Sequence, residues 1–268
     1  MLNLNPASTS SNFLNNAQDA TAKSLRQLST GLRINSAADN PAGLAVAVSL
    51  SAQATGLLQA ATNADHGISL TDTAVGAVGQ IGETLQQMRE LAVQAGGGTL
   101  NASDRQAIQS QIGQLGQQLD QVAGQAQFNG QKLLDGSFSS QIQTGAEAGQ
   151  TTSISIADLS GSALGVAGLD VSTAAGSASA LNAIDTALGS VSAQQSQLGA
   201  ISSGLSSARS SASAAAENAV AARSRIADTD FAATAASLTQ NKIQTQASLK
   251  ALAMYNDIQK QQVSSLLR

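Results

Sequence analysis

Apolar residues recur at intervals of three and four along three long stretches of the chain, which is the spacing of helices with one buried face. A run of three glycines at 96–98 separates the first stretch from the second. We therefore predict long helices over about residues 43–95, 103–126 and 177–228. The apolar positions that define them are Ala74, Val78, Ile81, Leu85, Met88 and Ala92, then Ile108, Ile112, Leu115, Leu119 and Val122, and then Leu181, Ile184, Leu188, Val191, Leu198 and Leu205.

Both ends of the chain carry a weaker heptad pattern, in which apolar residues alternate with polar residues at the seam positions. Such a seam is too poor in apolar surface to hold an isolated helix pair, although polar seam positions can fix its register. Because each end looks like half of the same structure, we predict that the termini pack together as a coiled-coil pair. The predicted packing residues are Leu14, Leu25, Leu28 and Leu32 from the N-terminal half and Leu238, Leu249, Leu252, Val263 and Leu266 from the C-terminal half.

The region of about residues 128–170 differs in composition, because Gly, Ser and Thr dominate it. Asn129-Gly130 is a turn signal. Further on, Ile154 and Ile156 alternate with serines, which is typical of a strand, and residues 140–144 could pair with it. We predict a β-hairpin in this region.

A cluster of cap and turn residues separates the N-terminal helix from the first long helix. We interpret this cluster as a joint between two helical rods. The joint residues are Arg33, Asn35, Asp39, Asn40, Pro41 and Gly43.

Together these elements predict a mostly α fold. It consists of an elongated antiparallel helical bundle, which forms a rod with a small β-hairpin, plus a terminal α-helical coiled-coil pair. The predicted domains are residues 1–42, which hold the N-terminal half of the inner coiled-coil domain and the joint, residues 43–230, which form the rod, and residues 231–268, which hold the C-terminal half.

The composition is typical of slender, closely packed helices. Apolar residues make up 42% of the 268 residues, but aromatic residues make up only 2%, with no Trp and one Tyr. Aromatic side chains contribute the largest buried areas to compact cores. We therefore expect a thin core, which leaves the lone subunit marginally stable and lets assembly add stability.

Charge and cysteine content argue against several kinds of partner. The net charge is −4 and cysteine is absent, so the chain has no basic footprint for nucleic acid and no thiolate metal site. Ser, Thr and Gln interrupt the uncharged stretch Pro41–Ala64 too often for lipid, and we predict no membrane insertion. No signal-peptide pattern follows Met1, and we expect secretion without a cleaved signal peptide.

No constellation of residues indicates catalysis, a cofactor or a metal. His66 is the only histidine, which excludes a His-Glu-x-x-His zinc site, and we interpret it as a surface or partly packed helical residue. Asp228 and Asp230 lie beside Arg223 and Arg225, which favours a solvated or inter-subunit ion pair over paired catalytic carboxylates. We predict a protein that is not an enzyme and binds no cofactor or metal.

Asn101-Ala102-Ser103 matches the acceptor pattern for N-linked sugars. Because this tripeptide lies between the glycine run and the next helix, we interpret it instead as a loop that caps the helix. We expect Ser103 or Asp104 to be the N-cap of that helix.

Several blocks of the sequence closely resemble bacterial flagellin. The segment from Ser29 to Gly43 reads much like the N-terminal signature of that family. The resemblance spans both termini and is weakest between about residues 135 and 177. Further support comes from Arg89–Gln94, Gln127–Leu134, Ala221–Asp228 and the closing Leu266-Leu267-Arg268.

The resemblance implies a structural subunit of the flagellar filament, which is exported unfolded through the flagellar channel and self-assembles into a helical tube for swimming. It implies a homo-oligomer of many copies in the extracellular flagellum, with the terminal pair lining the inside of the tube. The implied partners are a flagellar export chaperone, the filament cap and hook-junction proteins. Because the chain has no room for the outer domains that many flagellins insert in mid-chain, it resembles a minimal two-domain flagellin.

Two alternative functions stay open. One is a hook–filament junction protein, which shares terminal sequence with flagellin, and the other is a secreted adhesion or binding protein on a flagellin-like scaffold. The role of the joint is open as well, because it could act in switching or register, or could only cap the adjoining helices.

The resemblance extends to a motif that the innate immune receptor for flagellin reads. Arg89, Glu90 and Leu91 agree with the family, but Gln87 stands where many flagellins have Arg, and Gln111 matches a position of Glu. The loss of one charge of each sign makes recognition by that receptor doubtful.

Overall fold

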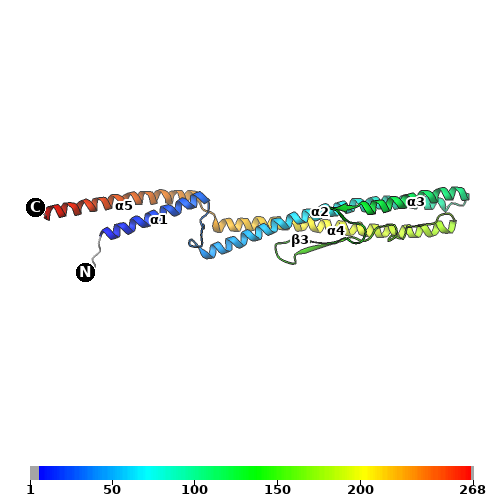
Figure 1. Cartoon of the computed structure of the whole chain (residues 1–268), viewed down its shortest axis with the longest axis horizontal. Helices are drawn as coiled ribbons and strands as arrows, with labels where there is room; N and C mark the ends of the chain where they lie inside the picture. The colour runs from blue at the N-terminus through cyan, green and yellow to red at the C-terminus, as the bar shows by residue number, and fades with distance from the viewer. Residues whose placement is uncertain (1–5, 267–268) are drawn as a thin grey trace. The chain divides into compact units, whose positions relative to one another are not determined.

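The computed structural model describes residues 6–266, which form five helices and two short antiparallel hairpins (Figure 1). Contacts divide the chain into a terminal unit, Met1–Gln53 with Asn218–Arg268, and a rod unit, Ala54–Glu217. The predicted fold class, mostly α with a small β-hairpin, is confirmed. The elements are α1 (Pro6–Thr30), α2 (Pro41–Ala95), α3 (Ala102–Gln125), β1 (Gln127–Phe128), β2 (Gln131–Lys132), β3 (Ser139–Gln143), β4 (Thr151–Ser155), α4 (Ala174–Ala227) and α5 (Phe231–Leu266).

The core of the rod unit is an apolar face shared by α2, α3 and α4. All six apolar positions predicted for α2, from Ala74 to Ala92, are completely buried. The same spacing completely buries Leu119 on α3 and Leu198 on α4. The three predicted helix ranges are confirmed to within a few residues, because a long and regular apolar repeat leaves a helix only one face to bury.

The start of α3 corrects one prediction. Asn101, and neither Ser103 nor Asp104, is the N-cap, because its side-chain Oδ1 accepts the N–H of Asp104 at 2.9 Å. Asp104 returns a hydrogen bond, since its Oδ2 accepts the N–H of Asn101 at 3.2 Å. The two residues form a capping box, in which the acidic partner stands three residues after the cap. The interpretation of this tripeptide as a loop and cap is confirmed.

Two hairpins follow α3 in the rod unit. Asn129 and Gly130 adopt φ angles of 49° and 78°, which is the left-handed geometry of a tight turn between β1 and β2. In the second hairpin β3 pairs with β4 from Ser139↔Ser155 to Gln143↔Thr151. Ile154 is completely buried and Ile156 nearly so, which confirms the predicted hairpin and its inward face.

In the terminal unit α1 and α5 pack side by side (Figure 1). At two predicted positions, however, the seam uses the preceding residue. Leu25 and Leu249 are 48% and 47% exposed, whereas Ser24 is buried and Ser248 is half-buried. The prediction that these leucines lie in the seam is wrong for the single subunit, because small side chains occupy the seam and let the helices approach closely.

The other predicted packing residues have three different outcomes. Four leucines are half-buried, at positions 14, 28, 238 and 252. Leu32 is also half-buried, but it follows the end of α1 and belongs to the joint. Val263 is 54% exposed, which corrects its assignment to the seam, and the side chain of Leu266 lies outside the described residues.

The division into units also differs from the predicted domain boundaries. The first part of α2, up to Gln53, and the last part of α4, from Asn218, group with the terminal unit. The predicted boundaries were placed at the ends of helices, near residues 43 and 230. A helix can continue across a boundary because its hydrogen bonds are local, so helix ends do not mark the division.

Candidate assembly surface

Exposed apolar side chains are concentrated in the terminal unit. In the described part of the chain, Leu58 and Val93 are the only large exposed hydrophobic residues of the rod unit. Single exposed apolar residues are ordinary on a monomer, but a concentration of them marks an interaction surface. Those of the terminal unit are Phe13, Leu25, Val46, Val48, Val220, Phe231, Ile243, Leu249, Met254, Ile258 and Val263.

The seam between α1 and α5 buries little apolar surface of its own. Among the described side chains of these two helices, the buried ones are Ala17, Ser24 and Thr234. Across the seam, Nδ2 of Asn241 donates a hydrogen bond to Oγ of Ser24 at 3.3 Å. Two helices joined through small and polar residues form a weak pair, so most of their apolar surface stays available for other contacts.

Two grooves lie beside this seam, with volumes of about 320 Å³ and 410 Å³. Leu25 lines the smaller groove, and Phe13 lines the larger one. The smaller groove is lined by Gln18, Thr21, Ala22, Leu25, Lys242, Thr245 and Gln246. The larger is lined by Phe13, Asn16, Ala17, Ala20, Gln244, Ala247 and Ser248.

Helix α5 carries a second apolar stripe that the sequence analysis missed. Ile243, Ala247, Met254 and Ile258 follow one another at intervals of four, seven and four residues, and all four are exposed. At 3.6 residues per turn Ile243, Met254 and Ile258 face away from the seam positions Thr245 and Leu252, whereas Ala247 also lines the larger groove beside the seam. The heptad spacing of this second stripe is visible in the sequence. Only the structure shows that α1 covers the other stripe of α5 and leaves this one exposed.

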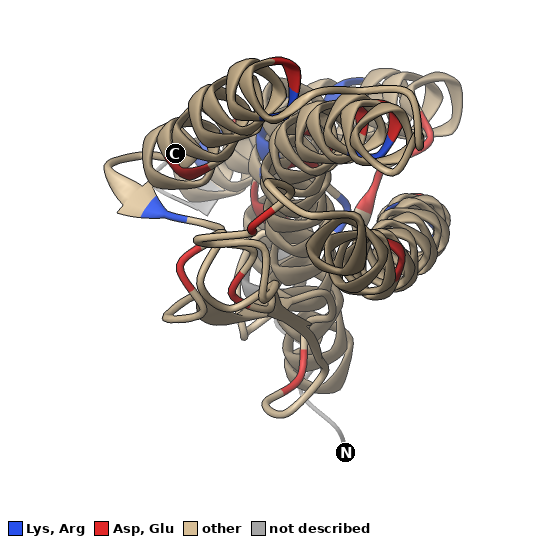
Figure 2. Ribbon diagram, turned by 90° about the vertical axis from the view of Figure 1, so that its right-hand side faces the viewer, with Lys and Arg blue, Asp and Glu red and all other residues tan. Residues whose placement is uncertain are grey.

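Charged residues are thinly spread over the ribbon (Figure 2). In the described part of the chain, neither Asp228 nor Asp230 forms an ion pair with Arg223 or Arg225. Asp230 instead caps α5, since its Oδ1 accepts the N–H of Ala233 at 3.0 Å. The inter-subunit ion pair stays a prediction.

The joint begins where α1 ends. Gly31 has a φ of 72°, and its N–H donates to the carbonyl of Gln27 at 2.9 Å. A glycine in this left-handed conformation is the usual residue just past a helix end, because a side chain there would be strained. From this point the chain leaves the direction of α1.

The next residues of the joint pair with the end of α4. Leu32 and Asp228 form an isolated antiparallel bridge. The N–H of Arg33 donates to the carbonyl of Ala227 at 2.7 Å, and its guanidinium Nη2 donates to the carbonyl of Ile226. The two chain segments that enter and leave the terminal pair are thus hydrogen-bonded to each other.

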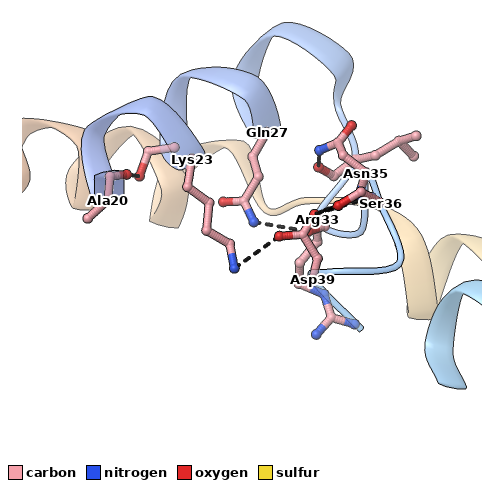
Figure 3. Close-up of polar contacts among 9 residues, drawn as sticks. Ala20, Lys23, Gln27, Arg33, Asn35, Ser36 and Asp39 are labelled. Carbon is pink, nitrogen blue, oxygen red and sulfur yellow. Dashed lines mark hydrogen bonds and ion pairs between the residues drawn. The ribbon is translucent and has the colours of Figure 1, made fainter. Parts of the chain in front are cut away.

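Asp39 is the centre of the polar contacts in the joint (Figure 3). Its Oδ2 accepts hydrogen bonds from the N–H groups of Asn35 at 3.2 Å and Ser36 at 3.3 Å. Its Oδ1 lies 3.2 Å from Nζ of Lys23 on α1. The Lys23 ammonium, followed by the Asn35 N–H, holds the pKa of the Asp39 carboxyl below its ordinary value.

The joint ends at the cap of α2. Oδ1 of Asn40 accepts the N–H of Gly43 at 2.9 Å, and Pro41 occupies the first helical position, where its missing N–H is not needed. A Cβ on Gly43 would lie 2.7 Å from Cδ1 of Ile34. Ile34 is 4% exposed, so this contact anchors the joint. Ile34 is not among the joint residues predicted from the sequence, because a single isoleucine between turn residues carries no cap or turn signal.

Four of the five residues of the receptor-like motif share one groove of about 460 Å³ in the rod unit. Arg89 does not line it. Its Nε lies 2.6 Å from Oδ1 of Asp185 on α4, and this partner raises the pKa of the guanidinium. The motif residues that line the groove are Gln87, Glu90 and Leu91 of α2 and Gln111 of α3.

Within residues 6–266, no three His, Cys, Asp or Glu side chains gather as ligands for a metal ion. His66 is exposed on α2.

Two family models match the chain over most of its length. The bacterial flagellin N-terminal helical region matches residues 2–139, and the bacterial flagellin C-terminal helical region matches residues 181–267. The chain belongs to the bacterial flagellin family. The unmatched residues between the two regions include most of the segment where the resemblance is weakest.

Similar proteins agree with this membership. The chain is 37% identical to a flagellin of Bacillus subtilis, with 96% of each chain aligned. It is 40% identical to a flagellin of Halalkalibacterium halodurans over 92% of this chain and 91% of that protein. The crystal structure of Bacillus cereus flagellin has a TM-score of 0.53 and 26% identity, and the match covers 56% of this chain and 88% of that one.

As a member of the flagellin family, the chain is a structural subunit of the extracellular flagellar filament, which is a polymer of many copies. Matches to flagellins along nearly the whole length favour this function over a junction protein or an adhesin. The family is a structural one.

Proposed function

We propose that the terminal unit makes the main contacts between copies in the filament, and that α1 and α5 gain most of their stability when these contacts form. One observation carries the proposal. The large hydrophobic side chains that the described subunit leaves exposed are nearly all in this unit. A surface of this kind is stabilised when another chain covers it.

The exposed side chains of the terminal unit would contribute free energy to assembly when they are buried. Full burial of one Phe, Ile or Met side chain contributes about 1.5–3 kcal/mol. Phe13 and Phe231 are 64% and 66% exposed, and Ile243 and Met254 are 62% and 63% exposed. Covering these side chains would add to the stability of helices whose own seam is polar.

The apolar stripe of α5 is the part of this surface with the clearest partner. Its heptad spacing fits the side of another helix, and the helices that a filament brings to it are the terminal helices of other copies. Within a single subunit, the opposite side of α5 packs against α1. Each α5 would then have a helix of its own copy on one side and a neighbouring copy on the other.

Seeded assembly of the full chain tests the proposal. Dissociated subunits with Ile243→Gln and Met254→Gln are returned to neutral pH with filament seeds, and filament mass is followed by sedimentation and negative-stain microscopy. We expect the critical concentration to rise at least about tenfold, since two apolar side chains lose their burial.

The matched control is Leu58→Gln, which changes an equally large side chain, 55% exposed, in the rod unit. We expect a smaller rise from it. Equal critical concentrations for the α5 variant and the unmodified chain would overturn the proposal.

The same properties suit the export route that the family resemblance implies. A thin core and a weak terminal pair favour passage through a narrow channel in an unfolded state. An export chaperone would cover the apolar stripe of α5 before export, whereas the filament cap and the hook-junction proteins would meet the same surface at the two ends of the polymer. Loss of chaperone binding in the Ile243→Gln, Met254→Gln variant would support this part of the proposal.

The apolar surface of α2 belongs to the same proposal. By length and composition α2 could cross a membrane, because an 18-residue window has a mean hydropathy of 1.4 and only 22% of it is buried. We assign this surface, which includes exposed Val46 and Val48, to contacts between copies. Flotation of the subunit with liposomes would contradict the assignment.

In this proposal the surfaces themselves are the function. It includes no catalytic step, no cofactor, no metal and no nucleic-acid partner.

A further inference from the structure

A groove lined by glutamines runs along the rod unit between α2 and α3. On α2 it contains Gln80, Gln87 and Gln94, which are seven residues apart. On α3 five of the six lining glutamines stand at intervals of three and four, at Gln111, Gln114, Gln118, Gln121 and Gln125, and Gln117 adds a sixth. We call this feature the amide groove.

The amide groove is long and almost uncharged. It consists of two cavities of about 690 Å³ and 460 Å³, which share Gln114 and Gln118. The only ionisable side chain in its lining is Glu90. Each glutamine offers both donors and an acceptor, so the groove can bond polar uncharged groups of either kind.

The spacing of the glutamines indicates the shape of the occupant. Two neighbouring helices with heptad-spaced residues along their common outer side form the holes into which a third helix inserts its side chains. The occupant that fits is therefore a helix with small, polar and uncharged side chains. The charged side chains of a charged helix would lose their hydration in the groove, where Glu90 is the only charged group that they could meet.

The rod unit itself presents such a helix side on α4. Six exposed positions at intervals of three and four lie opposite the buried residues Ile184, Leu198 and Leu205. No charged residue occurs between Asp185 and Arg209. The six positions, which we call the α4 stripe, are Gly189, Ala193, Ser196, Ala200, Ser203 and Ser207.

The contacts within the subunit do not explain why position 189 is a glycine. A Cβ built on Gly189 would meet nothing within 4 Å. Glycine weakens an exposed helix relative to alanine, so its presence here has a cost that the single subunit does not offset. Close approach of a helix pair from another copy would explain why a glycine stands at this position.

We infer that the α4 stripe of one copy docks in the amide groove of the next copy. The two surfaces lie on different helices of the rod unit, so the contact is heterologous, and each joined copy keeps one surface of each kind available for another neighbour. Such a contact extends into an open polymer. The inference rests on the proposed function, to which it adds a second and chemically different interface.

Cysteine cross-linking in assembled filaments tests the inference, and the chain offers a clean background because it contains no cysteine. Gln87→Cys or Gln118→Cys is combined with Ser196→Cys or Ser203→Cys in the same chain, which gives four double variants. Filaments of each are oxidised with copper phenanthroline and separated by non-reducing electrophoresis. A disulfide needs Cα atoms about 4.4–6.8 Å apart, so the four combinations also report the register.

We expect at least one double variant to give a ladder of covalent oligomers, and each single variant to stay monomeric. Covalent dimers from a single variant would show a symmetric contact and overturn the inference, because one cysteine per chain can join only two copies. The absence of ladders from all four double variants, in filaments of normal appearance, would also overturn it and would leave the proposed function intact. Failure of the unmodified chain to form filaments would overturn both.

A charge substitution provides an independent measurement. Gln118→Glu places a carboxylate in the groove, and we expect the critical concentration to rise on the order of tenfold. Ser110→Glu is the control, because Ser110 is exposed on the same helix outside the groove. Equal effects of the two substitutions would contradict the inference.

Discussion

The ammonium Nζ of Lys23 lies 3.2 Å from Oδ1 of Asp39, so that an ion pair connects α1 to the loop that precedes α2. The same carboxylate accepts backbone hydrogen bonds from Asn35 and Ser36. One side chain therefore both folds the joint and fastens it to the terminal pair. The ion pair thus connects the joint directly to α1, whether the joint residues act in switching or only as caps.

We predict that acid loosens the joint through Asp39. The folded-state pKa of this carboxyl is below its ordinary value of 3.8, so its contribution to stability is present above pH 3.8 and is lost as the pH falls through the folded value. Amide hydrogen exchange at Asn35 and Ser36 should lose protection over that range. In Asp39→Asn the protection should stay at the low level that the unmodified chain reaches in acid and should not titrate, whereas Asp19→Asn should behave like the unmodified chain. Protection that is independent of pH in the unmodified chain would contradict the prediction.

The contact between Gly43 and Ile34 gives a second prediction. A Cβ at position 43 would lie 2.7 Å from Cδ1 of Ile34 and 2.8 Å from Nδ2 of Asn40, so Gly43→Val should lower the free energy of unfolding by about 1–3 kcal/mol. Thermal unfolding of the dissociated subunit, followed by circular dichroism, would measure it. The control is Gly76→Ala in the same helix, where a Cβ meets nothing within 4 Å. That change should stabilise by about 0.5–1 kcal/mol, and a neutral Gly43→Val would show that Ile34 moves aside without cost.

The polar seam of the terminal pair gives a third prediction. Asn241 is half-buried opposite Ser24, whose hydroxyl also donates to the carbonyl of Ala20 at 3.0 Å. Asn241→Leu should therefore leave Ser24 hydrogen-bonded and raise the stability of the α1–α5 pair by roughly 1–3 kcal/mol through apolar burial. Helical content of the dissociated subunit at low concentration should increase. Gln240→Leu, at an exposed neighbouring position, should change it little, and equal gains would mean that general hydrophobicity is responsible.

The groove that is lined by residues of the receptor-like motif gives a fourth prediction. Gln87 and Gln111 line it from α2 and α3, where many flagellins carry an Arg and a Glu. In a reporter assay for the innate immune receptor, the unmodified subunit should signal weakly, and the Gln87→Arg, Gln111→Glu double variant should signal more strongly. Arg209→Ala removes the ion pair with Asp65 elsewhere in the rod unit and serves as a control for general damage to the rod. Full activity of the unmodified subunit would refute the prediction.

Prediction from the sequence succeeded where the apolar pattern was long and strong. The predicted ranges of the rod helices agree with the structure to within a few residues, and the hairpin of β3 and β4 is present as predicted. Large apolar residues such as Ile81, Leu198 and Ile154 are buried only when one particular face of their helix or strand is turned to the core. It failed at Asn101, where three neighbouring polar residues could each cap a helix and the choice depended on which backbone N–H pointed at which side chain.

The terminal pair shows the limit more clearly. Leu25 and Ser24 are adjacent, and a heptad frame can be drawn through either. A leucine seam would bury more apolar area, yet the packed helices use Ser24 and Ala17. The larger side chains are left for surfaces that a single chain cannot cover.

The sequence by itself determined the helices of the rod, the hairpin, the turn chemistry of the joint and membership of the flagellin family, because each of these depends on local spacing or on residue identity. Only the tertiary structure decided which stripe of α5 faces α1, that Ile34 anchors the joint, and that glutamines of α2 and α3 line one groove. The physical reason is that a helix with apolar or small residues on several sides has no unique inward face until its neighbours are in place.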